Sequence, residues 1–194
     1  MVSAIAEMMA PRRAMEPELI SEVAIDQMLW DAIQEDQIRA RRNVIPHGER
    51  HIARASDEIV QALGTSDFAA SLRASVIDGN LSRSVYATYL YYREGDWVPL
   101  HVDDWNIFEF SCLVCLERTR GSSRPTATYF LLGRENVMAL DLNVGEAVWF
   151  HGVHIPHGRT PLSKGESVVL LNLGFSSSGT TDRLYEEKNH HQAT

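Results

Sequence analysis

The chain has 194 residues, 44% of them hydrophobic, and a formal net charge of −8 at pH 7. A chain of this length can bury one sizeable core, which predicts a single domain over residues 1–194. The acidic balance repels nucleic acid and anionic membranes over most of the surface, so we expect small molecules as partners.

The N-terminal region lacks the features of a targeting or membrane segment. The sequence contains no apolar run of the roughly 18 residues that a membrane-spanning helix needs. Glu7 interrupts the apolar stretch that a signal peptide would require. We therefore expect a cytoplasmic protein.

Residues 16–82 have the spacing of helices and are expected to act as a helical support. Over residues 18–42, apolar side chains recur every three or four positions, which predicts one long helix. A turn is expected around Pro46 and Gly48. Two shorter helices are predicted after it, over residues 56–63 and 66–77.

Residues 83–176 contain short runs rich in Val, Tyr, Phe, Leu and Thr, separated by Gly and Pro, which predict strands. The predicted strands cover residues 84–92, 107–116, 126–132, 137–142, 146–150, 157–162 and 167–175. About seven strands at this spacing predict a closed or sandwiched β-structure. The expected fold is therefore mainly β, with a β-core braced from outside by flanking helices and followed by a polar tail over residues 177–194.

The two cysteines, Cys112 and Cys115, have the CxxC spacing of redox and zinc sites. They fall in a predicted strand, where residues three apart point to opposite faces of the sheet, so their sulfur atoms cannot converge on one metal ion. We interpret both as buried structural cysteines.

The segment GDWVPLHVDDW, residues 95–105, places a histidine and an aspartate two positions apart. On a strand, His101 and Asp103 point to the same side while Val102 points to the other. A histidine from another strand would complete a 2-His-1-carboxylate site, which binds Fe(II) on one face and leaves the opposite positions open. The segment WFHGVHIPHGRTPL supplies the candidates His151, His154 and His157.

Two motifs resemble the Fe(II)/2-oxoglutarate-dependent oxygenases, in the compact form related to prolyl hydroxylases and small-metabolite hydroxylases. In YYREGDWVPLHVD, Tyr92 and Gly95 precede the HxD triplet as they do in that family. In GEAVWFHGVHIPHGRTPLSKGESVVLLNLGF, a glycine-led strand ends in aromatic residues and is followed by a histidine, a PL pair and a GE turn. The matching positions are Gly145, Trp149, Phe150, His157, Pro161, Leu162, Gly165 and Glu166. The resemblance covers residues 84–176, about half of the chain.

The resemblance implies a double-stranded β-helix, the jelly-roll or cupin-like core of that family. It implies an iron site made by His101, Asp103 and His157, with 2-oxoglutarate as cosubstrate and dioxygen as the oxidant. His154 and His151 remain alternatives to His157. The implied reaction is hydroxylation of an unactivated carbon in a small metabolite, such as an amino acid or a biosynthetic intermediate.

One position departs from the family pattern. Ser167 stands where the family has the basic residue that holds the distal carboxylate of 2-oxoglutarate. Because a carboxylate is costly to bury without a cation or several donors, another residue must replace it. Arg159 is the first candidate, since it lies two residues from His157 and faces the same interior. The hydroxyl groups of Tyr92 and Ser167 are expected to add hydrogen bonds.

Two other functions remain open from the sequence. A cupin-type metalloenzyme, such as an isomerase or a 2-oxoglutarate-independent dioxygenase, would share the barrel. Ser167 is compatible with this alternative, because it replaces the basic residue that binds 2-oxoglutarate in the oxygenase family. A non-catalytic β-barrel binding module with a vestigial metal site is the second alternative.

Overall fold

The computed structural model describes residues 16–76, 81–82, 85–104, 107–121 and 126–177. The helices are α2 (Gln27–Ala40), α3 (Asp57–Thr65) and α4 (Asp67–Ala74), with a short 3-10 helix at Arg41–Asn43. The strands are β1 (Glu18–Ile20), β2 (Ile45–His47), β3 (Arg50–Arg54), β4 (Tyr86–Tyr92), β5 (Val98–His101), β6 (Phe110–Thr119), β7 (Thr128–Leu131), β8 (Val137–Leu140), β9 (Ala147–Phe150), β10 (His157–Arg159) and β11 (Ser167–Phe175). The expected mainly β fold with flanking helices is confirmed. No helix in these ranges has the length and apolar character needed to span a membrane.

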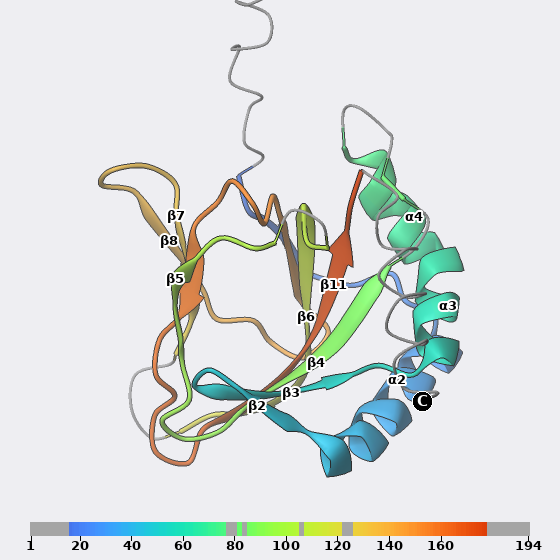
Figure 1. The fold of residues 1–194 in the computed structure, drawn as a ribbon, viewed down its shortest axis with the longest axis horizontal. Helices are drawn as coiled ribbons and strands as arrows, with labels where there is room; N and C mark the ends of the chain where they lie inside the picture. Colours follow the sequence, from blue (N-terminus) through green and yellow to red (C-terminus); the bar gives the residue numbers. More distant parts are fainter. Residues whose placement is uncertain (1–15, 77–80, 83–84, 105–106, 122–125, 178–194) are drawn as a thin grey trace, which may run out of the picture.

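Two antiparallel sheets form the β-part of the molecule. The larger sheet has seven strands in the order β1-β9-β6-β11-β4-β3-β2, and the smaller has four in the order β5-β10-β7-β8. The helices line one side of the molecule, and β5, β7 and β8 lie on the opposite side (Figure 1). The larger sheet therefore forms a middle layer, between the helices and the smaller sheet.

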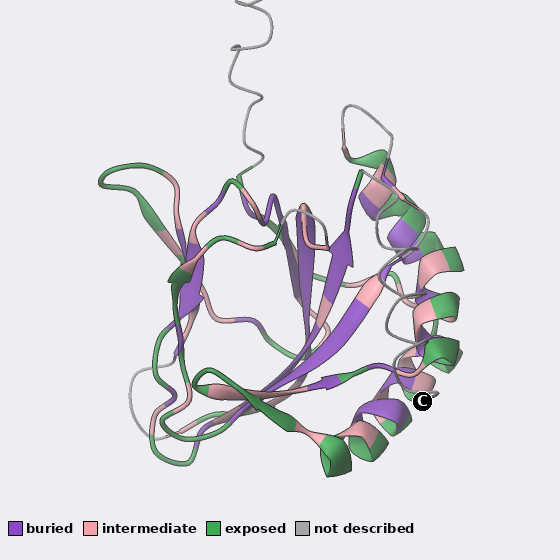
Figure 2. Cartoon of the chain, viewed as in Figure 1, coloured by how far each residue is buried: buried purple, intermediate pink, exposed green. Residues whose placement is uncertain are grey.

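Both faces of the larger sheet are buried, as the colouring of its central strands shows (Figure 2). Along β11, Val169 and Leu171 pack with the helices in one hydrophobic cluster, the outer cluster. Val168 and Leu170 pack with the smaller sheet in a second, the inner cluster. The alternation follows from the two-residue period of a strand. The helices contribute Leu29, Ile33, Ile59, Leu63, Phe68 and Leu72 to the outer cluster.

The single helix expected over residues 18–42 is wrong in its first part. Glu18–Ile20 forms β1, which pairs with β9 so that Leu19 lies opposite Val148. The helix begins only after Asp26, whose Oδ1 accepts a hydrogen bond from the backbone N–H of Leu29 at 2.9 Å. An N-cap of this kind satisfies a backbone donor that the first helical turn leaves free.

A β-hairpin occupies the segment where only a turn was expected. Strands β2 and β3 pair across the turn at Gly48, which has a φ of +60° that favours glycine. Residues 16–82 thus contribute three strands to the larger sheet besides the helices. The two helices expected over 56–63 and 66–77 are confirmed, at Asp57–Thr65 and Asp67–Ala74. Of the expected polar tail, residues 178–194 lie outside the described residues.

The two cysteines point to opposite faces of β6, as predicted. Cys112 packs in the outer cluster and Cys115 in the inner one. Burial raises the pKa of both thiols, that of Cys115 to about 11. Both are therefore protonated structural residues at neutral pH.

Candidate metal centre

His101 and His157 lie opposite each other on adjacent strands of the smaller sheet. His101 ends β5 and His157 begins β10, and the two residues are partners in the antiparallel register. Their ring centroids are 4.4 Å apart. Because the strands are distant in sequence, sheet pairing brings these two imidazoles together, and local sequence does not.

Asp103 lies two residues beyond the end of β5, instead of on the strand as predicted. Its backbone N–H donates a hydrogen bond to the carbonyl oxygen of Gly152 at 3.0 Å, which connects this segment to the loop after β9. Its Oδ1 lies 3.6 Å from Nε2 of His101 and 3.6 Å from Nε2 of His157. Ligand atoms of the three residues all lie within 4.8 Å of one another.

The remaining polar atoms of the three side chains are held by the protein. Nδ1 of His101 lies 2.9 Å from the carbonyl oxygen of Pro99, and Nδ1 of His157 lies 2.9 Å from that of Ile155. Donation of Nδ1–H to these carbonyls leaves each Nε2 as the free ligand atom. Ser111 donates a hydrogen bond of 2.6 Å to Oδ2 of Asp103, which leaves Oδ1 facing the imidazoles.

The electrostatics of the cluster keep the carboxylate ionised. Burial alone would raise the pKa of Asp103, but the close approach of His101 and His157 outweighs burial and holds that pKa far below its usual range. The same contact with Asp103 raises the pKa of His101, against the opposing effect of burial. Two imidazole nitrogens and one anionic oxygen are the donor set of a 2-His-1-carboxylate site, so the residues present fit a divalent iron ion.

Gly152 allows the loop after β9 to approach the centre closely. A Cβ atom added at this position would collide with the carboxylate of Asp103, the hydroxyl of Ser111 and the carbonyl oxygen of Phe108. Any side chain here would therefore displace Asp103 or the loop.

The other two candidate histidines lie outside the cluster. The rings of His151 and His154 stack on each other with centroids 4.2 Å apart, and His151 also packs against Phe110 at 4.3 Å. Of the three histidines named from the sequence, the one that meets His101 and Asp103 is His157.

A small cavity of about 40 Å³, the inner cavity, lies beside the three ligands between the two sheets. Its wall includes Tyr92, Thr128 and Arg159. The side chain of Arg159 is buried, and its Nη1 donates a hydrogen bond to Oγ1 of Thr128 at 3.1 Å. The guanidinium carbon lies 5.2 Å from the centroid of the Tyr92 ring.

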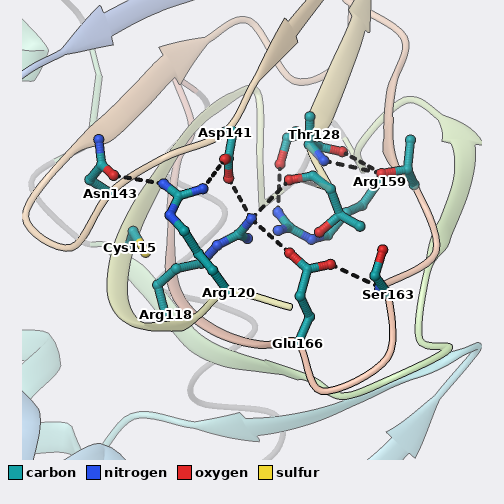
Figure 3. A network of polar contacts seen from close by, with 12 residues as sticks. Cys115, Arg118, Arg120, Thr128, Asp141, Asn143, Arg159, Ser163 and Glu166 are labelled. Carbon is teal, nitrogen blue, oxygen red and sulfur yellow. Dashed lines mark hydrogen bonds and ion pairs between the residues drawn. The ribbon is translucent and has the colours of Figure 1, made fainter. Parts of the chain in front are cut away.

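Two buried arginines at this end of the barrel differ in their partners (Figure 3). Nη2 of Arg118 lies 2.5 Å from Asp141 and 3.2 Å from Glu166, so its charge is balanced by two carboxylates. Within the described residues, Arg159 has no carboxylate partner, and its Nε is buried without a hydrogen-bond partner. Burial lowers the pKa of Arg159, as expected for a desolvated cation. A buried guanidinium without an anion indicates a binding site for one.

Comparison with known proteins gives matches among solved structures only. No family model and no curated protein matches the chain. A 2OG-Fe(II) oxygenase family oxidoreductase from Burkholderia pseudomallei superposes with a TM-score of 0.68 at 12% identity, over 84% of this chain and 85% of that one. A prolyl-4-hydroxylase from Pseudomonas putida gives 0.59 at 14% identity, over 91% and 99%. HygX from Streptomyces hygroscopicus, solved with nickel, 2-oxoglutarate and hygromycin B bound, gives 0.64 at 11% identity, over 84% and 83%. The chain has the fold of the 2OG-Fe(II) oxygenases.

The expected jelly-roll core of these oxygenases is thereby confirmed. At such low identity the similarity concerns the fold, so the roles of individual residues depend on the geometry of this chain.

Among the residues expected to hold 2-oxoglutarate, the oxygenase fold brings Tyr92 and Arg159 together with the ligand cluster but leaves Ser167 outside it. Burial raises the pKa of Tyr92, so its hydroxyl stays protonated. Ser167 lies opposite Thr119 at the start of β11 and is absent from the inner cavity's wall. It shares a face of β11 with Val169, which packs in the outer cluster, because residues two apart on a strand point the same way.

A larger outer cavity of about 450 Å³ opens beside the cluster. Its walls come from the β2–β3 hairpin, the segment around β5, and strands β4 and β11. Arg50 and Asn172 line both cavities, and no sequence motif distinguishes Arg50 from the other arginines. Asn172 did carry a signal, since it is the one amide in the apolar run SVVLLNLGF.

Proposed function

We propose that the protein is an Fe(II)/2-oxoglutarate-dependent oxygenase in which His101, Asp103 and His157 hold the iron. The support is the convergence of three ligand atoms whose side chains are already fixed by backbone carbonyls and Ser111. When bound, Fe(II) and 2-oxoglutarate supply the oxidation chemistry, in which dioxygen is consumed and the keto acid leaves as succinate and carbon dioxide. The protein's own residues bind, orient and exclude water.

The observation that carries the cosubstrate assignment is the buried, unneutralised guanidinium of Arg159. It lies on the same strand as His157 and lines the same inner cavity as the three ligands. A dicarboxylate with its keto-acid end at the metal would place its far carboxylate in this region. Arg159 would supply the charge, and Thr128 and the hydroxyl of Tyr92 would supply further hydrogen bonds.

The proposed substrate is a small metabolite, such as an amino acid or a biosynthetic intermediate, hydroxylated at an unactivated carbon. The outer cavity has a volume typical of small-molecule sites and opens onto His101 and Asp103. The net charge of −8 disfavours nucleic acid and anionic membranes as partners. We place this activity in the cytoplasm.

The test is a titration of the anaerobic protein with Fe(II) and 2-oxoglutarate, which should produce the visible charge-transfer band of an iron-bound keto acid. In Arg159→Gln the dissociation constant for 2-oxoglutarate should rise about 10- to 100-fold, since hydrogen bonds between charged groups contribute about 1.5–3 kcal/mol. Arg120→Gln is the matched control, because Arg120 belongs to the neighbouring polar network, with a side chain 47% exposed. It should leave the affinity unchanged.

Two outcomes would count against the proposal in different ways. If the parent protein bound iron but showed no charge-transfer band with 2-oxoglutarate, the cosubstrate assignment would be wrong and a cupin-type metalloenzyme would be favoured. If Arg159→Gln showed a normal charge-transfer band and an unchanged affinity for 2-oxoglutarate, the cosubstrate assignment would stand, but Arg159 would not be the residue that binds its far carboxylate.

A further inference from the structure

Arg50 and Asn172 form a polar wall between the inner and outer cavities. Both line the two cavities, as do His101 and Asp103 of the metal centre. Arg50 begins β3, and Asn172 lies in the middle of β11, opposite Thr88 on β4. A molecule in the outer cavity therefore meets these two side chains next to the metal ligands.

The polar atoms of this wall are incompletely satisfied. Nε of Arg50 and Oδ1 of Asn172 are buried and have no hydrogen-bond partner. Across the described ranges of the chain, Arg50 also takes part in no ion pair. Because buried polar groups are nearly always paired, a cation and an amide left open in one wall indicate a ligand with complementary groups.

The outer cavity has the opposite charge at its exposed side. Glu49 and Asp104 are exposed, and they line the outer cavity but not the inner one. The wall that a ligand meets in this cavity thus carries a guanidinium next to the metal ligands and two carboxylates on exposed residues.

We propose that the substrate is a free α-amino acid whose carboxylate is bound by Arg50 and the amide N–H of Asn172, with its ammonium group directed to the side of Glu49 and Asp104. The guanidinium matches a carboxylate with two parallel donors. Oδ1 of Asn172 accepts from the adjacent ammonium, so one amide serves both groups of an α-amino acid. This assignment rests on the proposed function, since the reaction takes place at the metal centre beside this wall.

The test uses the protein loaded with Fe(II) and 2-oxoglutarate without oxygen. The proteinogenic L-amino acids are added one at a time, each with its methyl ester and its decarboxylated amine as matched probes. At least one amino acid should shift the charge-transfer band and, in air, accelerate succinate release. Its ester and amine should bind at least about tenfold more weakly, because each loses the charge-assisted contact with Arg50.

Variants then separate the substrate from the cosubstrate as the partner of Arg50. Arg50→Gln should weaken binding of that amino acid about 10- to 100-fold while leaving the affinity for 2-oxoglutarate within about twofold. Arg50→Lys should retain part of the binding, because it keeps the charge but loses the planar fork. Arg54→Gln is the control, since Arg54 lies on the same strand but lines neither cavity.

The proposal is overturned if no amino acid shifts the band, or if the esters bind as well as the acids. It is also overturned if Arg50→Gln weakens the binding of 2-oxoglutarate but not that of the amino acid, which would show that Arg50 binds the cosubstrate. Failure of the proposed function is distinguishable from all of these, because the parent protein would then show no band with Fe(II) and 2-oxoglutarate.

Discussion

Carbonyl and hydroxyl contacts decide which atoms of His101, Asp103 and His157 are free to bind a metal ion. Each Nδ1 lies against a backbone carbonyl two residues earlier in the chain, and Oδ2 of the aspartate is held by a serine. The three free atoms face one another as a result. Such outer contacts orient the ligands and reduce the ordering that metal binding requires.

Replacing one ligand should abolish metal binding, whereas replacing a nearby histidine should not. In His157→Ala, affinity for Ni(II), a redox-inert substitute for iron, should fall at least about 100-fold, since even the outer partners of metal ligands are worth 10- to 100-fold. His154→Ala is the matched control, because His154 is exposed and stacks on His151 away from the cluster. Calorimetric titration measures both. Equal losses in the two variants would argue against His157 as the ligand.

At the residue scale, the HxD pair and the downstream histidine were predictable because short motifs are local properties, although Asp103 lies beyond the strand whose alternation was used to place it. Ser167 was expected beside the cosubstrate, but the sequence does not indicate which of the two alternating faces of β11 points toward the smaller sheet. Arg50 was missed because its position depends on a hairpin whose strands carry His and Arg instead of an apolar pattern.

At the scale of elements, a polar network joins β6, the segment after β8 and the turn before β11 (Figure 3). Glu166 accepts a hydrogen bond from the backbone N–H of Ser163 at 2.8 Å and pairs with Arg118 at 3.2 Å. Both side chains of this ion pair are at most 4% exposed. Removal of one partner therefore leaves the other charge buried with less compensation.

Glu166→Gln should lower the free energy of unfolding by about 3–5 kcal/mol, the usual cost of breaking a buried ion pair from one side. Chemical denaturation at neutral pH measures the loss. Glu135→Gln is the control, because Glu135 is exposed in the turn between β7 and β8, and its effect should be within about 0.5 kcal/mol. A small change in Glu166→Gln would show that the ion pair is energetically neutral.

The same carboxylate predicts a pH dependence. Burial acts to raise the pKa of Glu166, but the hydrogen bond from the backbone N–H of Ser163 and the charge of Arg118 help to outweigh it and lower that pKa. A lowered folded-state pKa gives a contribution that is complete above the ordinary glutamate pKa of about 4.3 and is lost as pH falls through the folded value. The stability difference between parent and Glu166→Gln should therefore shrink in acid. A difference independent of pH would contradict this explanation.

The later strands and the two short helices were predictable from periodicity, since each carries its pattern within itself. The three N-terminal strands were not. β1 has only three residues, within apolar spacing that also suits a helix, and its pairing with β9 is a contact between distant segments. Tertiary pairing overrides local propensity in such short elements.

On the scale of the whole molecule, the two faces of the larger sheet have different roles. Its outer face packs against the helices, and its inner face, with the smaller sheet, borders the candidate metal centre and both cavities. A ligand that binds the centre therefore connects the two sheets of the folded state, because the histidines belong to the smaller sheet while Tyr92 and Asn172 belong to the larger.

Ligand binding should accordingly stabilise the whole fold. With Ni(II) alone at about 100 times its dissociation constant, linkage predicts about 2.7 kcal/mol of added stability. For a chain of this size that corresponds to a rise in Tm of about 5–10 °C, which a chelator should reverse. Differential scanning calorimetry of the parent protein and His101→Ala measures it. An equal rise in the variant would place the metal elsewhere.

The most direct test of the account is the position of the metal ion itself. Crystals grown with Ni(II) and 2-oxoglutarate, measured at the nickel absorption edge, should show one strong anomalous peak within bonding distance of Nε2 of His101, Oδ1 of Asp103 and Nε2 of His157. A peak beside His151 and His154 instead, or no peak at the three side chains, would contradict the central claim.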